Sequence, residues 1–241
     1  MKNILNDSKI AVIYHGDYYR SGPSPRMFNK HKTSNFFKCL DNHKNNILNF
    51  CQTYDIFFHT YTGPEDHKLV ECLSPTRYII QSHHPGRVNT FKLANMLPSS
   101  DMYDYILNLR FDLMFCKPIV SWPADHCKFN TLHPEGNMED WLTEHKTSDL
   151  LYFYPAMLHK NFIQCTNELF DLENLKRKKI RGYNRYRTRP IGWMHWAVKH
   201  LIPIIGKEMI HLMYPTPYFS GGGSGKQKDK PHNPIVYINR D

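Results

Sequence analysis

The feature that most restricts the fold is a short apolar run from Tyr103 to Leu109. Its last residues, Tyr-Ile-Leu-Asn-Leu, lack the strict alternation of apolar and polar side chains that marks a strand with one face in water. Such a run is typical of a central strand in a sheet that is covered on both faces. The sequence therefore predicts an α/β fold with this strand in its interior.

Two opposite charges interrupt the apolar pattern where this strand ends. Arg110 and Asp112 stand two residues apart, and Leu113 resumes the apolar run. Side chains at i and i+2 of a strand point the same way, so the guanidinium and the carboxylate should share one face. Open α/β sheets bind ligands at their carboxyl edge, which favours a functional pair. The alternative is an internal ion pair that satisfies only itself, and the spacing does not decide between the two.

Three more apolar runs predict strands before this one, and two stretches between them have helical spacing. The predicted strands are Lys9 to Tyr14, Tyr54 to Thr60 and Tyr78 to Gln81, and the predicted helices are Thr33 to Tyr54 and Val88 to Leu97. Strands that alternate with helices indicate a mostly parallel sheet with right-handed connections. We therefore expect a three-layer fold.

The second half of the chain is less regular, and its expected elements are shorter. We expect strands at Lys128–Leu132, Leu150–Tyr154, Met209–Met213 and Pro234–Asn239. We expect a short helix that begins at Glu139–Trp141 and longer helices from Pro155 to Leu172 and from Pro190 to Leu201. Pro203 should end the last of these helices.

Length and composition favour a single domain spanning residues 1–241. The chain is 41% hydrophobic and 14% aromatic, which suffices for one large core. No apolar run approaches the ~18 residues that a membrane-spanning helix needs, and the first residues lack the apolar region of a secretory signal. These features predict a cytoplasmic protein without a membrane span.

Residues that could bind metals or phosphates do not form a recognisable motif. The six cysteines lie far apart without a CxxC pair, which predicts reduced thiols rather than disulfides or a zinc site. His83 and His84 have no further ligand at suitable spacing. The glycine-rich segment from Ser220 to Lys226 lacks the first glycine and the Ser or Thr of a P-loop, so we interpret it as a flexible loop.

The positive charge of the chain is concentrated in one segment, Lys176 to Arg189. Eight of its residues are basic and none is acidic, so the rest of the chain sums to about +1 of the formal net charge of +9. With Tyr183 and Tyr186 among the cations, the segment fits a nucleic-acid-binding surface. It fits equally a mobile loop that closes over a phosphorylated substrate, or a solvated loop with no specific partner.

Three polar strand ends should meet at one edge of the predicted sheet. The first strand leads into a loop from His15 to Arg20 that contains a glycine, although the GxGxxG pattern of dinucleotide binding is absent. The second strand ends in His59 and Thr60, where a histidine is more often structural than catalytic. With the end at Arg110 and Asp112, these segments should converge on one cleft.

The order of these motifs resembles a group of polysaccharide-assembly glycosyltransferases from bacteria and large DNA viruses. The similarity rests on three stretches within residues 9–117: Ile-Ala-Val-Ile-Tyr-His-Gly-Asp-Tyr-Tyr-Arg, Tyr-Asp-Ile-Phe-Phe-His-Thr-Tyr and Tyr-Asp-Tyr-Ile-Leu-Asn-Leu-Arg-Phe-Asp-Leu-Met-Phe. The chain departs from that group in having Tyr61 where Trp is usual and one extra residue between Gly16 and Arg20. Arg110 stands where typical members carry the first acid of the Asp-x-Asp motif that holds a divalent ion.

This resemblance implies a GT-A-like fold in which residues 9–117 bind a nucleotide sugar and residues 118–241 contact the acceptor. The expected partners are a nucleotide diphosphate sugar, such as a UDP sugar, and a glycan or glycoprotein acceptor, with no stable nucleic acid. The expected cofactor is Mn²⁺ or Mg²⁺ held by Asp112. The residues expected to contact the donor are His15, Gly16, Arg20, His59, Thr60, Arg87, Arg110 and Asp112.

Glycosyl transfer also requires a group that deprotonates the acceptor hydroxyl, and charge that balances the leaving diphosphate. Asp149 is the first candidate for the base, followed by Glu139, Asp140 and His195. On the diphosphate, Arg20, Arg110 and the basic segment would supplement a metal ion or replace it.

Two other functions remain open from the residues alone. A non-enzymatic protein that binds single-stranded nucleic acid would use Lys176 to Arg189 and would bind in a salt-sensitive manner. A sulfo- or phosphotransferase would share this basic segment, although the chain lacks a proper phosphate loop.

Overall fold

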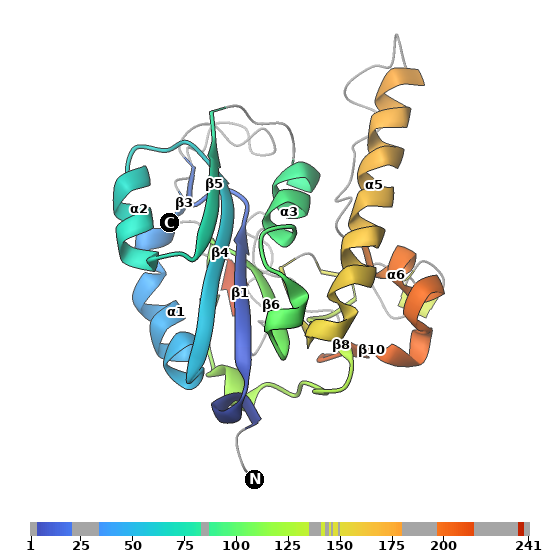
Figure 1. Ribbon diagram of the computed structural model, residues 1–241, viewed down its shortest axis with the longest axis horizontal. Helices are drawn as coiled ribbons and strands as arrows, with labels where there is room; N and C mark the ends of the chain where they lie inside the picture. Colours follow the sequence, from blue (N-terminus) through green and yellow to red (C-terminus); the bar gives the residue numbers. More distant parts are fainter. Residues whose placement is uncertain are drawn as a thin grey trace, which may run out of the picture.

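The computed structural model describes residues 4–20, 34–82, 87–134, 141–142, 145, 147–148, 150–179, 197–214 and 236–238. At residues 4, 6, 20, 34–35, 87–90, 170–179 and 236–238 it describes the backbone alone. The described residues form an α/β fold in which helices cover both faces of a mostly parallel sheet (Figure 1).

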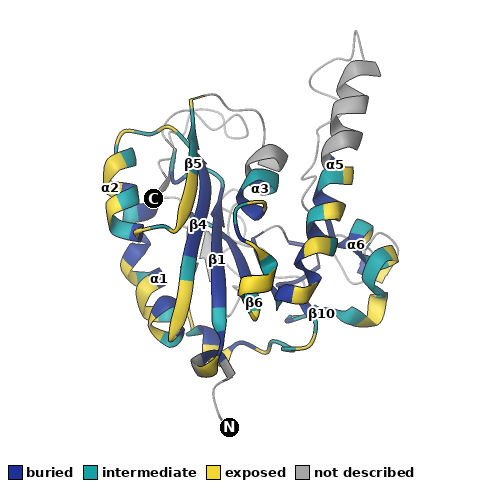
Figure 2. Ribbon diagram, viewed as in Figure 1, coloured by how far each residue is buried: buried dark blue, intermediate teal, exposed yellow. Residues whose placement is uncertain are grey.

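The central sheet has seven strands in the order β10-β8-β9-β6-β1-β4-β5. Neighbouring strands are parallel except at β9, which runs antiparallel to both β6 and β8. The strands are β1 (Lys9–His15), β4 (Thr53–Tyr61), β5 (Arg77–Gln81), β6 (Tyr105–Arg110), β8 (Phe129–Thr131), β9 (Leu151–Pro155) and β10 (Ile210–Leu212). Because β1 and β6 lie inside the sheet, their apolar residues are buried on both faces, as predicted from the continuous apolar runs (Figure 2).

Helices α1 (Leu40–Asn46) and α2 (Asp66–Leu73) cover one face of the sheet, and α3 (Arg87–Asn95), α5 (His159–Lys179) and α6 (Ala197–Ile205) cover the other (Figure 1). Short 3-10 helices connect many of these elements. They are η1 (Ile4–Asp7), η2 (Phe36–Lys38), η3 (Leu48–Phe50), η4 (Ser100–Met102), η5 (Ile119–Ser121), η6 (Ala156–Leu158) and η8 (Lys207–Met209).

Two small antiparallel ribbons flank the central sheet. Strand β2 (Tyr19–Arg20) pairs with β3 (Ser34–Asn35), and β7 (Leu113–Phe115) pairs with β11 (Val236–Ile238). The first ribbon follows β1 and the second follows β6, so both extend the chain beyond the carboxyl ends of central strands.

The strand order reverses next to β1. The chain passes from β1 to β4 and β5 by way of α1 and α2, then returns through α3 to β6 on the other side of β1. The chain that leaves β1 and the chain that enters β6 lie on opposite faces of the sheet. The carboxyl ends of β1 and β6 therefore form the topological switch point, where open α/β sheets bind ligands.

Aromatic side chains fill the core on both faces. On the face of α1 and α2, the Phe111 ring lies 5.2 Å from Tyr14 and 5.1 Å from Phe36. On the face of α3, the Phe162 ring lies 4.9 Å from Phe129 and 5.5 Å from Phe91. These contacts fix the side chains of the central strands and of the covering helices in place.

Each face also contains a buried histidine held between a tyrosine and a backbone carbonyl. Nε2 of His43 donates to Leu113 O at 2.7 Å, and its Nδ1 accepts from the Tyr14 hydroxyl at 3.2 Å. Nε2 of His159 donates to Asn95 O at 2.9 Å, and its Nδ1 accepts from the hydroxyl of Tyr154 at 3.1 Å. Because a carbonyl can only accept, Nε2 of each ring carries a proton, and burial, which lowers the pKa of both rings to about 4, favours the neutral form.

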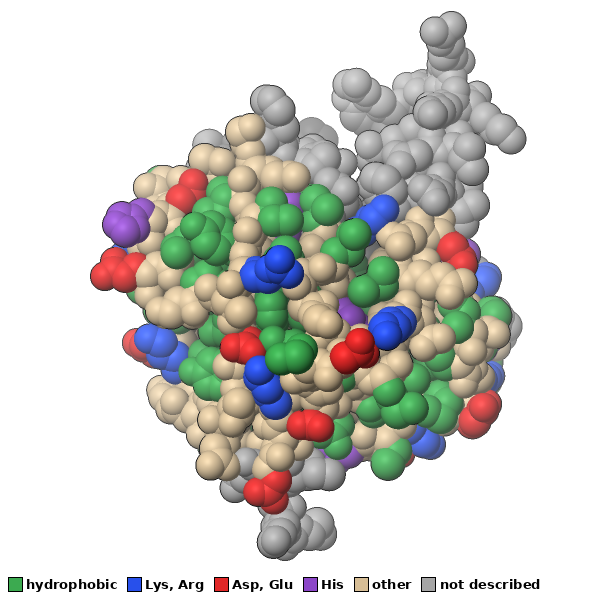
Figure 3. Space-filling model, viewed as in Figure 1, with side chains coloured by type: hydrophobic (Ala, Val, Ile, Leu, Met, Phe, Trp, Pro, Cys, Tyr) green, Lys and Arg blue, Asp and Glu red, His purple; other side chains and the backbone are tan. Residues whose placement is uncertain are grey.

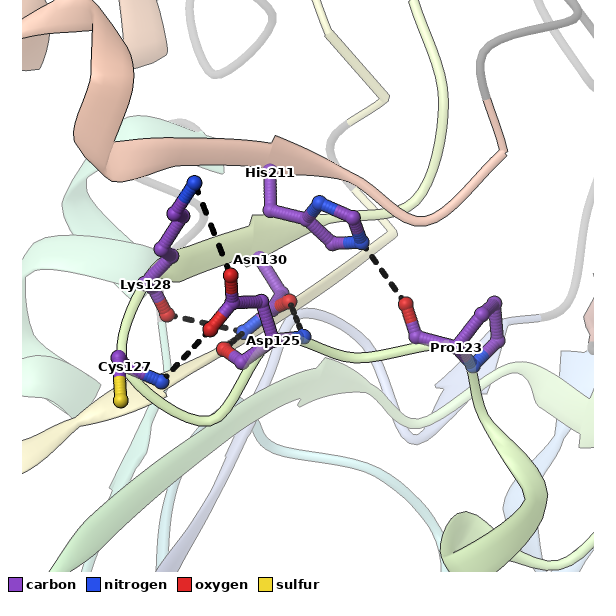
Figure 4. A network of polar contacts seen from close by, with 6 residues as sticks. All are labelled: Pro123, Asp125, Cys127, Lys128, Asn130 and His211. Carbon is purple, nitrogen blue, oxygen red and sulfur yellow. Dashed lines mark hydrogen bonds and ion pairs between the residues drawn. The ribbon is translucent and has the colours of Figure 1, made fainter.

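Asn130 of β8 organises the loop before that strand (Figure 4). Its side-chain nitrogen donates to the carbonyls of Asp125, Lys128 and Phe153 at 2.8–2.9 Å, and its oxygen accepts from the Asp125 backbone at 2.7 Å. Nearby, His211 of β10 donates to Pro123 O at 2.8 Å. A fully buried amide thus satisfies the backbone of the turn that leads into β8.

Most of the predicted strands are confirmed, but the predicted helix from Thr33 to Tyr54 is wrong. In its described part the chain forms β3, η2, α1 and η3 instead, and Ile47 leaves the helical conformation with φ −125°. Asparagine side chains favour such breaks because they bond to backbone carbonyls, as Asn46 does to Asn42 O at 3.0 Å. Helix α2 was not predicted.

The prediction that Pro203 ends the last helix is also wrong, because Pro203 lies inside α6. A proline inside a helix removes one hydrogen bond, but here tertiary contacts retain the helix. Ala197, Val198 and Leu201 are buried in the core beneath α5, and the Cys165 thiol donates to Ala197 O at 3.0 Å. Among the described helices, including the 21-residue α5, none is sufficiently long and apolar to cross a membrane.

Candidate functional site

The carboxyl ends of β1, β4 and β6 are direct neighbours. His15 of β1 is in register with His59 of β4 on one side and with Arg110 of β6 on the other. Neighbouring strands lie about 4.8 Å apart, and residues in register in a parallel pair point to the same face. The prediction that these three strand ends meet is therefore confirmed.

All three side chains belong to the face covered by α3. Ala11 and Ile13 of β1 lie in the core on that face, so alternation places His15 there as well. The contact between the rings of His15 and Phe91 of α3, 4.7 Å apart, agrees with this assignment. Phe57 and Ile106 of the same core place His59 and Arg110 on this face by the same rule.

Phe111 anchors the turn that follows β6 and separates Arg110 from Asp112. Its ring is buried on the opposite face among Tyr14, Phe36 and Phe58. Phe111 and Asp112 form a turn between β6 and β7, and across it Arg110 donates two hydrogen bonds to Asp112. Arg110 and Asp112 therefore emerge together at the switch point.

Helix α3 begins at the same edge of the sheet. It follows the carboxyl end of β5 and leads back to the amino end of β6, so its first turn faces the edge where His15 and His59 lie (Figure 1). The N-terminus of a helix carries partial positive charge. This edge thus combines a guanidinium, two imidazoles and the positive end of a helix dipole.

Gly16 begins the loop after β1 in a conformation that suits glycine. Its φ is +95°, and an added Cβ would meet no atom within 4 Å. The backbone there is open on the side where a side chain would stand, which allows close approach of a ligand.

Thr60 holds this loop in place from the other face of the sheet. Its hydroxyl accepts from the Tyr18 backbone at 3.3 Å. The Tyr18 hydroxyl donates to Asp66 at 2.9 Å and accepts from the Glu65 backbone at 3.0 Å. Thr60, expected among the donor-contacting residues, therefore lies in a different environment from His59, and Tyr18 is a loop-anchoring residue that the sequence did not single out.

Arg110 and Asp112 form a bidentate ion pair. Nε of Arg110 donates to Oδ1 of Asp112 at 2.9 Å, and Nη2 donates to Oδ2 at 2.5 Å. The side chains are only 16% and 10% exposed. Both carboxylate oxygens are thus engaged by one guanidinium, and paired hydrogen bonds of this kind are strong and directional.

The residues of this edge do not fit the divalent ion that the resemblance implies. Mn²⁺ and Mg²⁺ need several oxygen ligands, and Asp112 already accepts two hydrogen bonds from Arg110. Nor does the described part of the chain bring three His, Cys, Asp or Glu side chains together in a metal-binding arrangement.

Two buried histidines near the ion pair are neutral. Burial lowers the pKa of His43 to about 4, although its hydrogen bond to Leu113 and the nearby Asp112 act in the opposite direction. Burial likewise lowers the pKa of His59 to about 4, with the Gln81 side chain opposing the shift. His43 supports the backbone just after Asp112, whereas His59 is fully buried beside the Gln81 side chain.

His43 is a residue that sequence reasoning missed. It was one of several polar residues in a predicted amphipathic helix, and nothing in its spacing marks it as different from Lys44 or Asn45. Only the tertiary structure shows that His43 is buried between Tyr14 and β7 and hydrogen-bonds to the backbone of β7, the strand that follows the ion pair.

Several predicted site residues are not visible as side chains. Arg20 closes β2 and Arg87 opens α3, but only their backbones are described. The candidates for the base, Asp149, Glu139, Asp140 and His195, lie outside the described residues, as does the basic segment from residue 180 onward. Residues 176–179 continue the backbone of α5. On the face shown in Figure 3, basic and acidic side chains of the described part are interspersed.

Comparison of the sequence with models of known protein families finds no match, and comparison with curated proteins finds none either.

Proposed function

We propose that the protein is a glycosyltransferase that moves a sugar from a nucleotide diphosphate sugar to a hydroxyl of a glycan or glycoprotein. The donor binds at the carboxyl edge of β1, β4 and β6. The observation that carries the proposal is the register of His15 with both His59 and Arg110 at the switch point of the sheet. The order of the sequence motifs supports it.

The chemistry of this edge suits a leaving diphosphate. Departure of the nucleotide leaves negative charge on phosphate oxygens, and fixed positive groups stabilise that charge as it develops. Arg110 supplies a guanidinium that Asp112 holds in the free protein, α3 the positive end of its dipole, and the open backbone at Gly16 a place for close approach.

The acceptor hydroxyl needs a base on the other side of the sugar. Asp112 is engaged by Arg110, so it does not serve as that base while the pair is intact. The base is therefore assigned to the second half of the chain, with Asp149 first and Glu139, Asp140 and His195 as alternatives.

The test is a panel of UDP, GDP and dTDP sugars. Thermal stabilisation and release of the nucleoside diphosphate are measured for each, with and without Mn²⁺. A donor at a hundred times its dissociation constant should stabilise the protein by about 2.7 kcal/mol.

Matched arginine variants locate the effect. Arg110→Ala should remove most of the stabilisation and the turnover, whereas Arg77→Ala, at the exposed amino end of β5, should leave both unchanged. The proposal is refuted if no donor stabilises the protein, or if the protein instead binds single-stranded oligonucleotides with an affinity that Arg110→Ala does not change.

A further inference from the structure

We infer that the protein binds the donor's diphosphate with its own hydrogen-bond donors, chiefly Arg110, rather than through a divalent cation on Asp112. This inference rests on the proposed function and specifies how the site recognises its substrate.

The geometry of the ion pair leaves neither oxygen of Asp112 without a hydrogen bond from Arg110. Both oxygens of Asp112 accept from Arg110, at 2.9 Å and 2.5 Å, in a largely buried setting. A cation that bound Asp112 would have to displace the guanidinium and would then lie beside it. Two like charges at such a distance repel, and the repulsion is strong where water is scarce.

The ion pair lies beside other groups at the ends of the neighbouring strands. On the same face, the neighbouring strand ends present the imidazoles of His15 and His59, and α3 directs its N-terminus to the same edge. The ring of His59 is fully buried beside the Gln81 side chain. Asp17 follows Gly16 in the loop and is partly exposed. The described residues with hydrogen-bond donors at these strand ends are Arg110, His15 and His59.

The guanidinium of Arg110 can bind either a carboxylate or a phosphate. A planar guanidinium matches the spacing of phosphate oxygens as well as that of a carboxylate. In the free protein, Asp112 keeps the buried guanidinium neutralised and oriented. When a diphosphate arrives, it competes with Asp112 for the same donors. Asp112 is thus a positioning residue, and Arg110 is the group that contacts the phosphate.

The test is isothermal titration with inorganic pyrophosphate and with the nucleotide sugars of the panel, in excess EDTA and in excess Mn²⁺. We expect dissociation constants that agree within about threefold between the two conditions. We also expect Arg110→Ala to weaken binding in EDTA by at least tenfold, as loss of a charge-assisted contact should. Arg77→Ala is the matched control and should bind like the unaltered protein.

Asp112 variants separate positioning from metal ligation. Asp112→Asn keeps one acceptor for Arg110, so it should change affinity by the same factor in EDTA and in Mn²⁺. If Asp112 were a metal ligand, Asp112→Asn would instead weaken binding in Mn²⁺ and leave the affinity in EDTA unchanged. Since Arg110→Ala leaves a buried carboxylate unpaired, R110Q/D112N is a second variant that removes both charges while retaining a side-chain hydrogen bond.

The possible results distinguish failure of the inference about Arg110 from failure of the proposed function. Binding that appears only with Mn²⁺, and that Asp112→Asn abolishes, overturns the inference and leaves the proposed function standing. Binding to neither pyrophosphate nor any nucleotide sugar, in either condition, refutes the proposed function and the inference with it. Folding of each variant is checked by circular dichroism and thermal denaturation.

Discussion

Acidification toward pH 5 should strongly destabilise this protein, because three histidines are buried in the neutral form. His43, His59 and His159 are 0%, 0% and 1% exposed, and burial is the main cause that lowers the pKa of each from 6.5 to about 4. In the unfolded chain the same imidazoles take up a proton near their ordinary pKa. Between these two pKa values the unfolded state binds more protons than the folded state.

The sign and the magnitude follow from this difference. The stability that depends on neutral imidazoles is complete above about pH 6.5 and is lost as the pH falls toward 4. The full shift corresponds to about 3 kcal/mol per histidine, and about 2 kcal/mol is already lost at pH 5. Three histidines together lose about 6 kcal/mol at pH 5, which is comparable with the roughly 5–15 kcal/mol that hold a typical domain folded.

The assay is urea unfolding followed by circular dichroism at a series of pH values from 7.5 to 5. The unfolding free energy should fall steadily below pH 6.5. His43→Gln keeps a donor for Leu113 O but does not titrate, so it should reduce the loss between pH 7 and pH 5 by about 2 kcal/mol. His67→Gln, at an exposed position on α2, is the matched control for the substitution itself. Equal stability at pH 7 and pH 5, or a profile that His43→Gln does not flatten, would refute the reasoning.

Three further substitutions test other parts of the structure. Asn130→Ala removes the buried amide that bonds four backbone groups, so urea unfolding should show a loss of about 3 kcal/mol, and a loss below about 1 kcal/mol would contradict the network in Figure 4. Gly16→Ala meets no neighbouring atom but is strained at φ +95°, so denaturation should show a loss of about 1 kcal/mol, and an unchanged stability would argue against that backbone conformation. Asp55 has a lowered pKa because hydrogen bonds from Tyr103, Lys9 and Thr76 outweigh its burial, which acts in the opposite direction. Tyr103→Phe should therefore raise that pKa in an NMR titration and reduce stability above pH 4 by about 1 kcal/mol, whereas an unchanged titration would contradict the 2.7 Å contact.

The sequence was sufficient to predict the central strands and the edge at which the polar residues gather. The runs that became β1, β4 and β6 are short, apolar and poorly alternating, and a chain buries such runs only in a covered sheet. Polar residues directly after these runs had to emerge at the strands' carboxyl ends. The meeting of His15, His59 and Arg110 follows from those positions once the strands are neighbours. Their function as binding residues stays a prediction.

Helix boundaries were less predictable because local propensity competes with tertiary contacts. The apolar spacing from Phe36 to Phe50 is helical, but the chain divides there into η2, α1 and η3 around asparagines that bond to backbone. At Pro203 the balance is reversed, since buried neighbours on α5 keep α6 helical across a proline. No window of sequence contains the packing that decides these two cases.

The sequence by itself determined which residues stand at the ends of buried strands, because hydrophobicity and chain direction are local properties. Only the tertiary structure decided the strand order that places β1 between β4 and β6, the face on which each side chain lies, and the engagement of both Asp112 oxygens by Arg110. It also decided that His43 supports the chain after that pair. These features depend on contacts between residues far apart in the sequence, and such contacts are selected by the packing of the whole core rather than by any one segment.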